Sequence, residues 1–411
     1  MRILHVISQR PEQTGSGIYV QSIIREAGKR GHENFLLAGI PKNDYPSLDM
    51  ISQQNSSFVE FERENLPFPI VGMSDIMPYH SKRFSDLTDD QLAIYQTAFR
   101  EKLFEAVSRF QPDIIHSHHL WILTALVRKT FPTIPLVTSC HGTDLRQMAN
   151  CPQRGDQVAR YCQEINHVLV LSQSHIQQVN HTYNVPKKRI HIIGGGYNSD
   201  LFHNSQKPIN SRVEILYVGK LSRSKGVPWL LKSLNQIKGL PWFLHLVGSG
   251  SGAEHEECLK WANYLKGKIK LYGMLSQTEV AQLMRQSHLF VLPSFYEGLP
   301  LVLLEALASG CRIISTSLPG TQELFRDSLE EIVKLIPLPP LETIDRPHAK
   351  DEPVLENLLS ETLKNQINRI LEKPDIDLTP ARGIINYFSW AAVFKRIEQI
   401  YQNAVEISKC G

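Results

Sequence analysis

The chain has 411 residues, of which 42% are hydrophobic and 21% are charged, and its net charge is +3. This composition is typical of a folded globular protein, the length predicts two domains, and the small net charge argues against nucleic acid as a partner. We expect a cytoplasmic protein, because no apolar run approaches the ~20 residues of a membrane span and the start lacks the features of a secretory signal.

The cysteines predict neither a disulfide framework nor a metal site. They are scattered along the chain, at positions 140, 151, 162, 258, 311 and 410. The first three are evenly spaced and His141 stands beside one of them, but the paired ligand spacing of zinc sites is missing.

Short β-branched runs alternate with longer segments of helical periodicity, which predicts repeated βα units around parallel sheets. The first series of predicted strands covers 2–8, 34–39, 57–61, 113–118, 135–140, 167–171 and 190–193. The second series covers 213–218, 243–247, 268–273, 289–293, 312–316 and 331–335. Between the two series, residues 195–212 are rich in Gly, Asn and Ser and predict a linker.

We therefore predict an α/β protein of two doubly wound domains, 1–205 and 206–385, followed by a C-terminal helix in 386–411. The apolar stripe of "YFSWAAVFKRIEQIYQNAV" indicates that this helix packs on other parts of the protein and has a structural role, not that it binds a cofactor. Residues 336–353 contain five prolines and predict an exposed irregular loop.

The stripe of this C-terminal helix is a packing surface, and we expect it to pack back toward the N-terminal domain. The segment 66–84, "LPFPIVGMSDIMPYHSKRF", has the Pro, Met and aromatic content of an irregular loop. Such a loop fits either an acceptor-binding role or a plain scaffold role.

The loops that follow the predicted strands are the places to look for a site, since ligands bind at the carboxyl ends of strands in doubly wound sheets. After the first strand, Gly15, Ser16 and Gly17 open a helix, where backbone N–H groups can approach an anion. A tight strand-to-helix turn explains the same glycines equally well.

A second candidate loop is "HGTDLRQ", which brings His141, Asp144 and Arg146 together after the predicted strand at 135–140. A single histidine at a strand end is more often a hydrogen-bonded structural residue. Three polar groups in one short loop favour a site. The histidines at 116, 118 and 119 alternate across a strand end and stay unassigned.

In the second series, the loop "GKLSRSKG" concentrates Lys220, Arg223 and Lys225 at a helix start. A helix N-terminus adds to this positive potential, which favours a phosphate or diphosphate as ligand over a merely solvated basic face. The next loop, "GSGSG", contains Gly248 and Gly250. It is not a dinucleotide fingerprint, because the following strand ends without an acidic residue, but it lets a sugar or phosphate approach the backbone.

The stretch "FYEGLPLVLLEALASG" predicts a loop at 293–298 and a helix at 299–309, after a strand at 288–292. It places Glu297 at the mouth of the helix and Glu305 about two turns into it. Carboxylates on both sides of an otherwise apolar run are the layout of a site.

In this order and spacing, the motifs resemble the retaining glycosyltransferases of family 4, which belong to the group 1 glycosyltransferases. The resemblance rests on "GSG", "HGTD", "VGKLSRSKG", "PSFYEGLPLVLLEALASG" and the closing "FSW", and it covers nearly the whole chain. It implies the GT-B fold, in which two Rossmann-like domains face each other across a cleft. The N-terminal domain would be the acceptor side, and the C-terminal domain would bind a nucleotide sugar.

The resemblance also implies roles for the residues. Glu297 would accept hydrogen bonds from hydroxyls of the donor sugar, and Glu305 would hold the ribose hydroxyls. His141 would lie near the C6 hydroxyl of the sugar. The residues expected beside the diphosphate at the helix mouth are Gly298, Leu299, Pro300 and Leu301.

Lys220 and Lys225 stand where the family usually has an arginine followed by a lysine. Lysine supplies charge without the bidentate fork of arginine, and Arg223 compensates in part. Gly15 to Gly17 match the loop that closes over the phosphates. The remaining residues expected to bind the donor are Asp144, Gly248 and Gly250.

The implied chemistry is a front-face displacement without a protein nucleophile, in which Glu297, His141, Lys225 and Lys220 stabilise charge and position the donor. We expect no cofactor and no metal. A "DID" at 375–377 resembles a metal-binding motif of another glycosyltransferase fold, but it lies between prolines and far along the chain from the donor loops.

The resemblance thus predicts transfer of a hexose from a nucleotide diphosphate sugar, with a UDP-sugar as the donor, to a glycan or lipid-linked acceptor in bacterial surface or exopolysaccharide synthesis. No nucleic acid partner is expected, and a peripheral contact with the inner face of the membrane is left open. Two alternatives remain: a nucleotide-sugar epimerase of the same fold, and a noncatalytic subunit that binds a sugar nucleotide.

Overall fold

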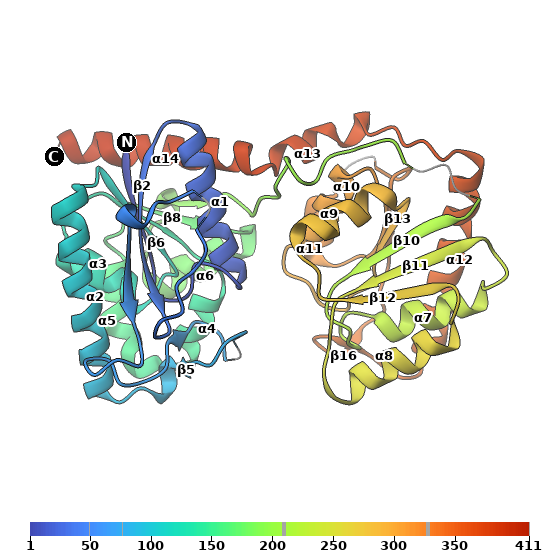
Figure 1. The fold of residues 1–411 in the computed structure, drawn as a ribbon, viewed down its shortest axis with the longest axis horizontal. Helices are drawn as coiled ribbons and strands as arrows, with labels where there is room; N and C mark the ends of the chain where they lie inside the picture. Colours follow the sequence, from blue (N-terminus) through green and yellow to red (C-terminus); the bar gives the residue numbers. More distant parts are fainter. Residues whose placement is uncertain (49, 76, 208–210, 326–328, 411) are drawn as a thin grey trace. The chain divides into compact units, whose positions relative to one another are not determined.

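The computed structural model describes residues 1–410 apart from 49, 76, 208–210 and 326–328. The chain divides into two compact units, each with its own parallel sheet (Figure 1). Unit 1 comprises Met1–Gly195 and Trp390–Gly411, and unit 2 comprises Gly196–Ser389.

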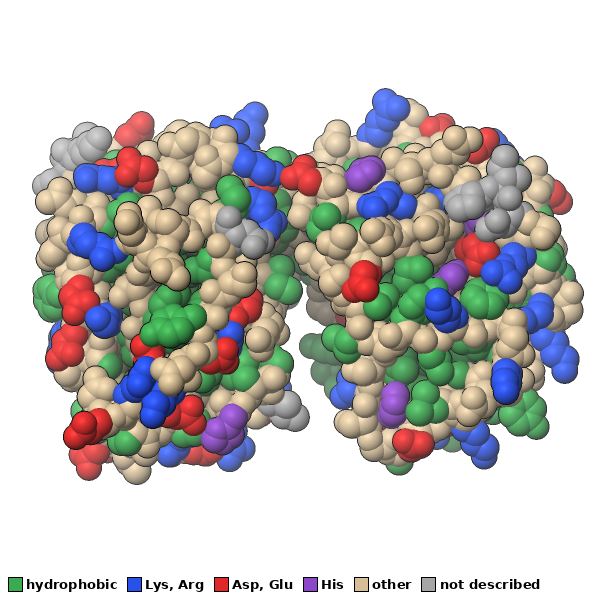
Figure 2. Space-filling view, viewed as in Figure 1, with side chains coloured by type: hydrophobic (Ala, Val, Ile, Leu, Met, Phe, Trp, Pro, Cys, Tyr) green, Lys and Arg blue, Asp and Glu red, His purple; other side chains and the backbone are tan. Residues whose placement is uncertain are grey.

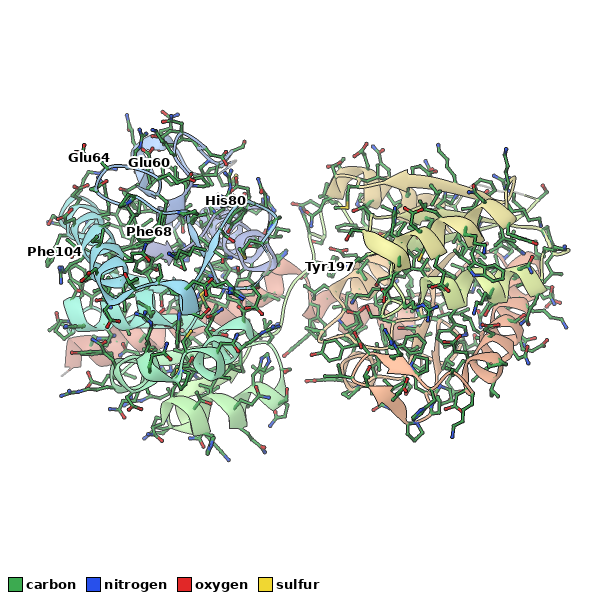
Figure 3. All side chains as sticks on the ribbon, turned by 90° about the horizontal axis from the view of Figure 1, so that it is seen from below. Glu60, Glu64, Phe68, His80, Phe104 and Tyr197 are labelled. Carbon is green, nitrogen blue, oxygen red and sulfur yellow. The ribbon has the colours of Figure 1, made fainter. Side chains whose placement is uncertain are left out.

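The boundary between the units lies earlier than the expected one at residue 205. Tyr197, labelled in Figure 3, and Phe202 are both buried in the hydrophobic core of unit 2. The first part of the expected linker, 195–212, therefore belongs to unit 2, and its residues 208–210 lie outside the described residues.

Unit 1 is built around a seven-stranded sheet in the order β3-β2-β1-β6-β7-β8-β9, and every neighbouring pair in it is parallel. Its strands are β1 (Arg2–Ile7), β2 (Glu33–Ile40), β3 (Ser56–Glu60), β6 (Ile114–His118), β7 (Leu136–Ser139), β8 (His167–Val170) and β9 (Ile190–Ile192), with a small separate pair, β4 (Val71–Gly72) and β5 (Lys82–Arg83). Its helices are α1 (Gly15–Lys29), α2 (Asp89–Phe110), α3 (Ile122–Thr130), α4 (Thr143–Asn150), α5 (Pro152–Cys162), α6 (Gln173–Tyr183) and α14 (Trp390–Cys410), and short 3₁₀ turns are η1 (Gln53–Asn55), η2 (Phe84–Asp86) and η3 (Lys187–Arg189).

Helices cover both faces of the unit 1 sheet, so its strands are apolar on both sides. On one face, Leu4, Val6 and Ile115 pack in a core with α2 and α3. On the other face, the strands pack against α1 and α14. The predicted stripe of the C-terminal helix is confirmed, since Trp390, Phe394, Ile397 and Tyr401 are buried in this second core and Ile400 packs against it.

Unit 2 is built around a six-stranded parallel sheet in the order β12-β11-β10-β13-β14-β15. Its strands are β10 (Val213–Val218), β11 (Trp242–Val247), β12 (Ile269–Gly273), β13 (Leu289–Leu292), β14 (Arg312–Thr316) and β15 (Val333–Ile336), with a hairpin of β16 (Leu341–Thr343) and β17 (Arg346–Pro347). Its helices are α7 (Val227–Gln236), α8 (Gly252–Tyr264), α9 (Gln277–Gln286), α10 (Leu301–Ala308), α11 (Pro319–Leu324), α12 (Glu352–Glu372) and α13 (Arg382–Tyr387), with the 3₁₀ turn η4 (Thr379–Ala381).

Both sheets follow the strand order of dinucleotide-binding doubly wound folds, in which the order reverses next to the first strand. The reversal falls between β1 and β6 in unit 1 and between β10 and β13 in unit 2. The fold class predicted from the sequence is confirmed, and every strand of the two predicted series is present.

Two segments predicted to be irregular loops contain a hairpin or buried core residues. The proline-rich segment 336–353 contains the hairpin of β16 and β17, and Pro347 is buried rather than exposed. In the segment 66–84, Phe68 and Phe84 are buried in the core of unit 1, whereas residue 76 lies outside the described residues. Much of this segment therefore serves as scaffold.

The distribution of charged side chains on the surface is consistent with the small net charge. On the face drawn in Figure 2, acidic and basic side chains are interspersed over both units. Among the described residues, no helix combines the length and the apolar character needed to cross a bilayer.

Candidate active site

The candidate site of unit 2 lies at the carboxyl ends of its strands, where the strand order reverses. The loops after β10 (219–226) and β13 (293–300) lie next to each other, because β10 and β13 are paired although they are far apart in sequence. Ligands of doubly wound folds bind at this point. The two loops are joined through their backbones, since the N–H of Phe295 donates to the carbonyl of Ser224 at 2.9 Å.

Lys225 and Glu297 form an ion pair across these two loops. The Lys225 ammonium donates to the Glu297 carboxylate at 2.8 Å, and it also lies 3.4 Å from the carbonyl oxygen of Tyr296. Their side chains keep 29% and 15% of their exposure, so both charges can still be reached from solvent. A cation and a carboxylate thus share one partly open position at the reversal of the sheet.

Glu305 lies in the second turn of α10. Among the described residues, no side chain or backbone group donates a hydrogen bond to its carboxylate, and no cation pairs with it. Burial raises the pKa of Glu305 to about 7. A carboxylate without a donor at a half-buried position is ready to accept hydrogen bonds from a ligand.

The start of α10 lies between the two glutamates. Pro300 is its N-cap, and no side chain caps the helix. The helix end carries the partial positive charge of its unpaired N–H groups. A Cβ added at Gly298 would meet nothing within 4 Å, so protein packing does not require a glycine there, and the backbone is open to a ligand.

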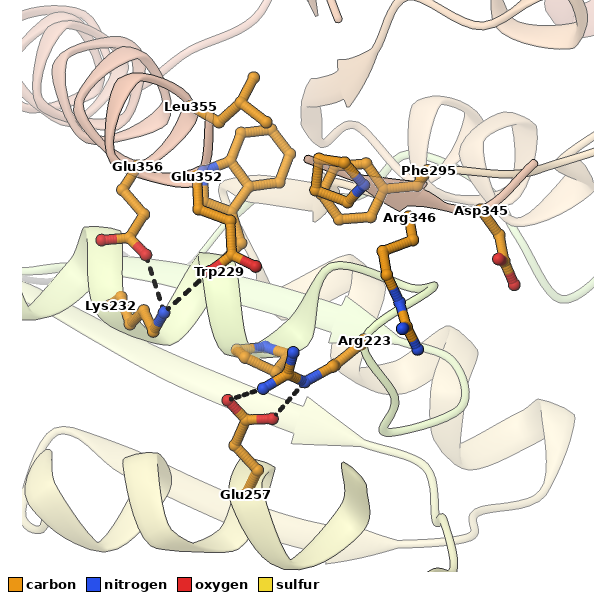
Figure 4. A pocket seen from close by; sticks show the side chains of 12 residues that line it. Arg223, Trp229, Lys232, Glu257, Phe295, Asp345, Arg346, Glu352, Leu355 and Glu356 are labelled. Carbon is orange, nitrogen blue, oxygen red and sulfur yellow. Dashed lines mark hydrogen bonds and ion pairs between the residues drawn. The ribbon is translucent and has the colours of Figure 1, made fainter. Parts of the chain in front are cut away.

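The two other predicted cations differ from each other. Lys220 is exposed and has no ion-pair partner among the described residues. Arg223 is occupied, because its guanidinium donates to Glu257 at 2.6 and 3.1 Å and its backbone N–H donates to Glu254 at 3.1 Å. Figure 4 shows Arg223 held by Glu257 at the edge of a groove that Trp229 and Phe295 also line. Arg223 therefore has a structural role in this loop, and its predicted role in donor binding stays a prediction.

Glycines bring the loops of the site into backbone contact. A Cβ at Gly248 would overlap the carbonyl oxygen of Gly219, and one at Gly226 would overlap that of Pro293. A Cβ at Gly250 would likewise crowd the carbonyl of Leu221. The predicted donor-binding glycines at 248 and 250 are thus required by the packing of the protein itself.

We expect Gly248→Ala to lower the free energy of unfolding by about 3 kcal/mol, because it combines a φ of +132° with a steric overlap. Gly239→Ala is the matched control: a Cβ there meets nothing within 4 Å, so its effect should stay within about 1 kcal/mol. Urea unfolding of the two variants measures the difference. Equal midpoints would contradict the packing role of Gly248.

In unit 1, the loop after β7 places His141 among aromatic rings. Its ring centroid lies 5.0 Å from that of Tyr19 on α1 and 4.8 Å from that of His119. Its Nε2 lies 3.4 Å from Nδ1 of His118. Burial, and then the neighbouring histidines, hold the pKa of His141 well below its usual value, so the ring is neutral at neutral pH.

The carboxylate of Asp144 is engaged by groups of the protein itself. Its buried carboxylate accepts hydrogen bonds from the backbone N–H groups of Leu120, at 2.8 Å, and of His141, at 3.2 Å. The thiol of Cys140 donates to it at 3.3 Å. Asp144 ties the loops after β6 and β7 together, and its predicted role in donor binding stays a prediction.

The three residues predicted to bind the donor at the start of α1 differ in how accessible they are. Gly15 has open space where a Cβ would point, whereas a Cβ at Gly17 would crowd the backbone of Pro11 and Glu12. Ser16 is buried and accepts a hydrogen bond from Gln9 at 2.9 Å. Of these three residues, only Gly15 keeps an open side.

Gln9 organises this loop, and the sequence did not single it out. Its amide nitrogen donates to Thr14 and Ser16, and its amide oxygen accepts from the N–H of Met73 at 3.2 Å. The signal for it was present in the sequence, because Gln9 is a polar residue directly after the first strand. The structure brings the unit 2 residues together around Lys225 and Glu297, and the unit 1 residues together around His141.

Comparison with known proteins identifies the two units. Residues 198–333 match the family model "Glycosyl transferases group 1", and residues 14–201 match "Glycosyltransferase Family 4". Over 340 residues, the chain is 23% identical to a glycogen synthase of Mycobacterium tuberculosis, a match that covers 79% of this chain and 80% of that protein.

Solved structures show the same fold. The sucrose-phosphate synthase of Thermosynechococcus elongatus superposes with a TM-score of 0.65 at 18% identity, covering 98% of this chain and 99% of that one. The Anabaena protein HepE, solved in complex with UDP and glucose, superposes with a TM-score of 0.62 at 16% identity, covering 98% of this chain and 100% of that one. The chain therefore belongs to the group 1 glycosyltransferases of family 4, and its two doubly wound units are those of the GT-B fold.

Proposed function

We propose that the protein transfers a hexose, with retention of configuration, from a nucleotide diphosphate sugar to a glycan or lipid-linked acceptor. The observation that carries this proposal is the cluster at the strand reversal of unit 2. There the Lys225–Glu297 pair joins two adjoining loops, and the second loop leads into the start of α10 and to Glu305, which has no hydrogen-bond donor in the described part of the chain. A UDP-sugar is the proposed donor. The complex of HepE with UDP and glucose, on the same fold, supports this choice.

The proposed binding mode matches each part of the donor to a group of suitable chemistry. Glu305 accepts hydrogen bonds from the ribose hydroxyls, and Glu297 accepts them from hydroxyls of the sugar. The diphosphate lies between them at the positive end of α10, near Lys225 and Lys220. The open backbone of Gly298 lets the ligand approach this helix end closely.

The unit 1 residues complete the proposal. His141 is neutral and partly exposed, so it can exchange a hydrogen bond with a sugar hydroxyl. Gly15 supplies an open stretch of backbone at the start of α1. Gly15 follows β1, which borders the strand reversal of the unit 1 sheet, and His141 follows β7, which is separated from the reversal by β6.

The proposed reaction needs no protein nucleophile. The bond between the anomeric carbon and the diphosphate oxygen breaks, and the electron pair stays on the diphosphate. The acceptor hydroxyl forms the new bond to the anomeric carbon from the same face, and its proton passes to the departing phosphate oxygen. The cations and the helix end stabilise the negative charge that develops on the diphosphate. We place the reaction in the synthesis of a bacterial surface glycan or exopolysaccharide.

The proposal is tested by incubating the protein with a panel of nucleotide sugars and following the release of nucleoside diphosphate. We expect one UDP-hexose to be hydrolysed slowly and to stabilise the protein against heat, by ~2.7 kcal/mol at 100 times the dissociation constant. NMR of the released or transferred sugar should show the anomeric configuration of the donor. An inverted product would overturn the retaining mechanism, and an epimerised donor without release of nucleoside diphosphate would identify an epimerase instead.

We expect the affinity for UDP to rise between about pH 6 and 8, because Glu305 has a pKa raised to about 7 and only its ionised form accepts both ribose hydroxyls. Glu305→Gln should weaken UDP binding roughly 10- to 100-fold at pH 8 and remove most of this pH dependence. Calorimetric titration at several pH values measures both. A variant that keeps the full pH dependence of the parent would exclude Glu305 as its source.

The same pKa has a consequence for stability. The folded-state pKa of Glu305 lies above its ordinary value, so the folded state holds this proton more tightly than the unfolded state does. The contribution of Glu305 to stability is therefore present at acid pH and is lost as the pH rises through about 7. Glu305→Gln should gain stability relative to the parent above that pH.

A further inference from the structure

A group of buried histidines lies in unit 1 on the face of the sheet that α1 and α14 cover. His5 is on β1, and His116 and His118 are on β6, where His5 is the direct neighbour of His116. His116 and His118 are two residues apart on one strand, so they point to the same face. All three are at most 1% exposed.

His5 presents a lone pair to this group. The amide nitrogen of Asn34 donates to the carbonyls of His32, at 3.2 Å, and of Ile24, at 3.5 Å. The amide oxygen of Asn34 therefore faces His5 and accepts from its Nε2–H at 3.0 Å. The Nδ1 of the neutral ring is then unprotonated, and it is buried without a hydrogen-bond partner among the described residues.

His118 presents its second nitrogen in the same way. Its Nδ1 lies 3.4 Å from Nε2 of His141, and its Nε2 is buried without a partner among the described residues. His116 differs, because its Nδ1 contacts the Tyr401 hydroxyl at 2.6 Å and its Nε2 contacts the Ser139 hydroxyl at 2.9 Å.

The candidate ligand atoms of the three rings lie within 4.8 Å of one another. Zinc binds imidazole nitrogen at ~2.0–2.1 Å, so closing the rings onto one ion takes shifts of about 1 Å. Imidazole nitrogens suit Zn²⁺ and similar transition metals, whereas Mg²⁺ and Ca²⁺ prefer oxygen ligands.

We propose that His5, His116 and His118 form a buried site for a zinc-type transition metal ion, bound through Nδ1 of His5, Nε2 of His118 and one ring nitrogen of His116. His116 exchanges one of its two hydroxyl contacts for the metal and keeps the other. Asn34 and His141 then accept from the second ring nitrogens of His5 and His118, as outer-shell partners of metal-bound histidines do. The site links β1 and β6.

This proposal is independent of the sugar-transfer reaction. It adds a structural ion to unit 1, and it leaves the donor loops of unit 2 without a metal. Because His141 contacts His118, metal binding would also fix the orientation of His141. Asn34 and His141 are positioning residues here, since they act through the ligands.

The test uses the full chain with any purification tag removed, dialysed against a chelator and then titrated with Zn²⁺ and with Co²⁺. We expect one equivalent of Zn²⁺ by elemental analysis, visible d–d absorption from the Co²⁺ form, and a higher melting temperature with either metal. His5→Gln and His118→Ala should weaken binding by at least ~10²-fold, and Asn34→Ala by roughly 10- to 100-fold. His191→Ala is the matched control, because His191 lies on β9 of the same sheet outside the group.

The wild-type protein decides the question even if a variant fails to fold. The proposal is overturned if the wild-type protein takes up no Zn²⁺, or if all the Zn²⁺ that it takes up is lost in the His191→Ala variant. It is also overturned if the wild-type protein shows no Co²⁺ absorption. In that case a buried water bridging Nδ1 of His5 and Nε2 of His118 accounts for the two nitrogens. Binding that is unchanged in both His5→Gln and His118→Ala would also overturn it, because the metal would then sit elsewhere.

Discussion

Replacing Lys225 by alanine should lower the turnover of sugar transfer about 10²- to 10³-fold at saturating donor. The breaking glycosidic bond leaves negative charge on the diphosphate, and a cation already fixed beside it stabilises the transition state more than the ground state. Lys225 is fixed in this way, since its ammonium donates to Glu297 at 2.8 Å. Steady-state release of nucleoside diphosphate measures the effect.

Alanine variants of two neighbouring cations are compared with this variant, one with a similar expected loss and one with a milder expected loss. Lys220→Ala should cause a similar loss, because Lys220 is exposed on the same loop without an ion-pair partner among the described residues. Arg223→Ala should be much milder, because Glu257 already engages its guanidinium. Thermal stability should change little in Lys225→Ala, since a partly exposed ion pair contributes no more than about 1 kcal/mol. Near-native turnover of Lys225→Ala would show that the diphosphate binds elsewhere.

The strands and the loops of the site could be predicted from the sequence, because both depend on local patterns. Short β-branched runs mark buried parallel strands, and glycines and charges mark the loops that follow them. The pairing of Lys225 with Glu297 could not be predicted in this way. These residues are 72 positions apart, and they meet only because β10 and β13 are neighbours in the sheet.

The roles of individual residues in the loops were harder to predict. A carboxylate that binds a ligand and one that accepts backbone N–H groups look alike in sequence, and Asp144 is of the second kind. The same holds for glycine: Gly298 is open, whereas Gly248 is required by contact with another loop. The hairpin of β16 and β17 was missed because strands this short show no alternation of apolar residues.

Glu297→Gln should lower turnover by ~10²-fold while leaving the affinity for UDP nearly unchanged. The substitution keeps the size of the side chain but removes the charge that accepts hydrogen bonds from the donor sugar. UDP lacks that sugar, so its binding does not use this contact. Turnover and calorimetric titration with UDP, measured on the same preparation, separate the two effects. An equal loss of UDP affinity in Glu297→Gln and Glu305→Gln would contradict the division of the donor between the two carboxylates.

The contact between Lys225 and Glu297 makes a further result predictable for the double variant. If each residue acts on its own part of the donor, the losses in Lys225→Ala and Glu297→Gln multiply. If each residue also holds the other in place, the second substitution lowers turnover by less than it does in the otherwise unchanged protein. The reason is that the effects of substitutions at residues in contact are not additive. The 2.8 Å ion pair favours the second outcome. We therefore expect the double variant to be slower than either single variant, but by less than the product of the two losses.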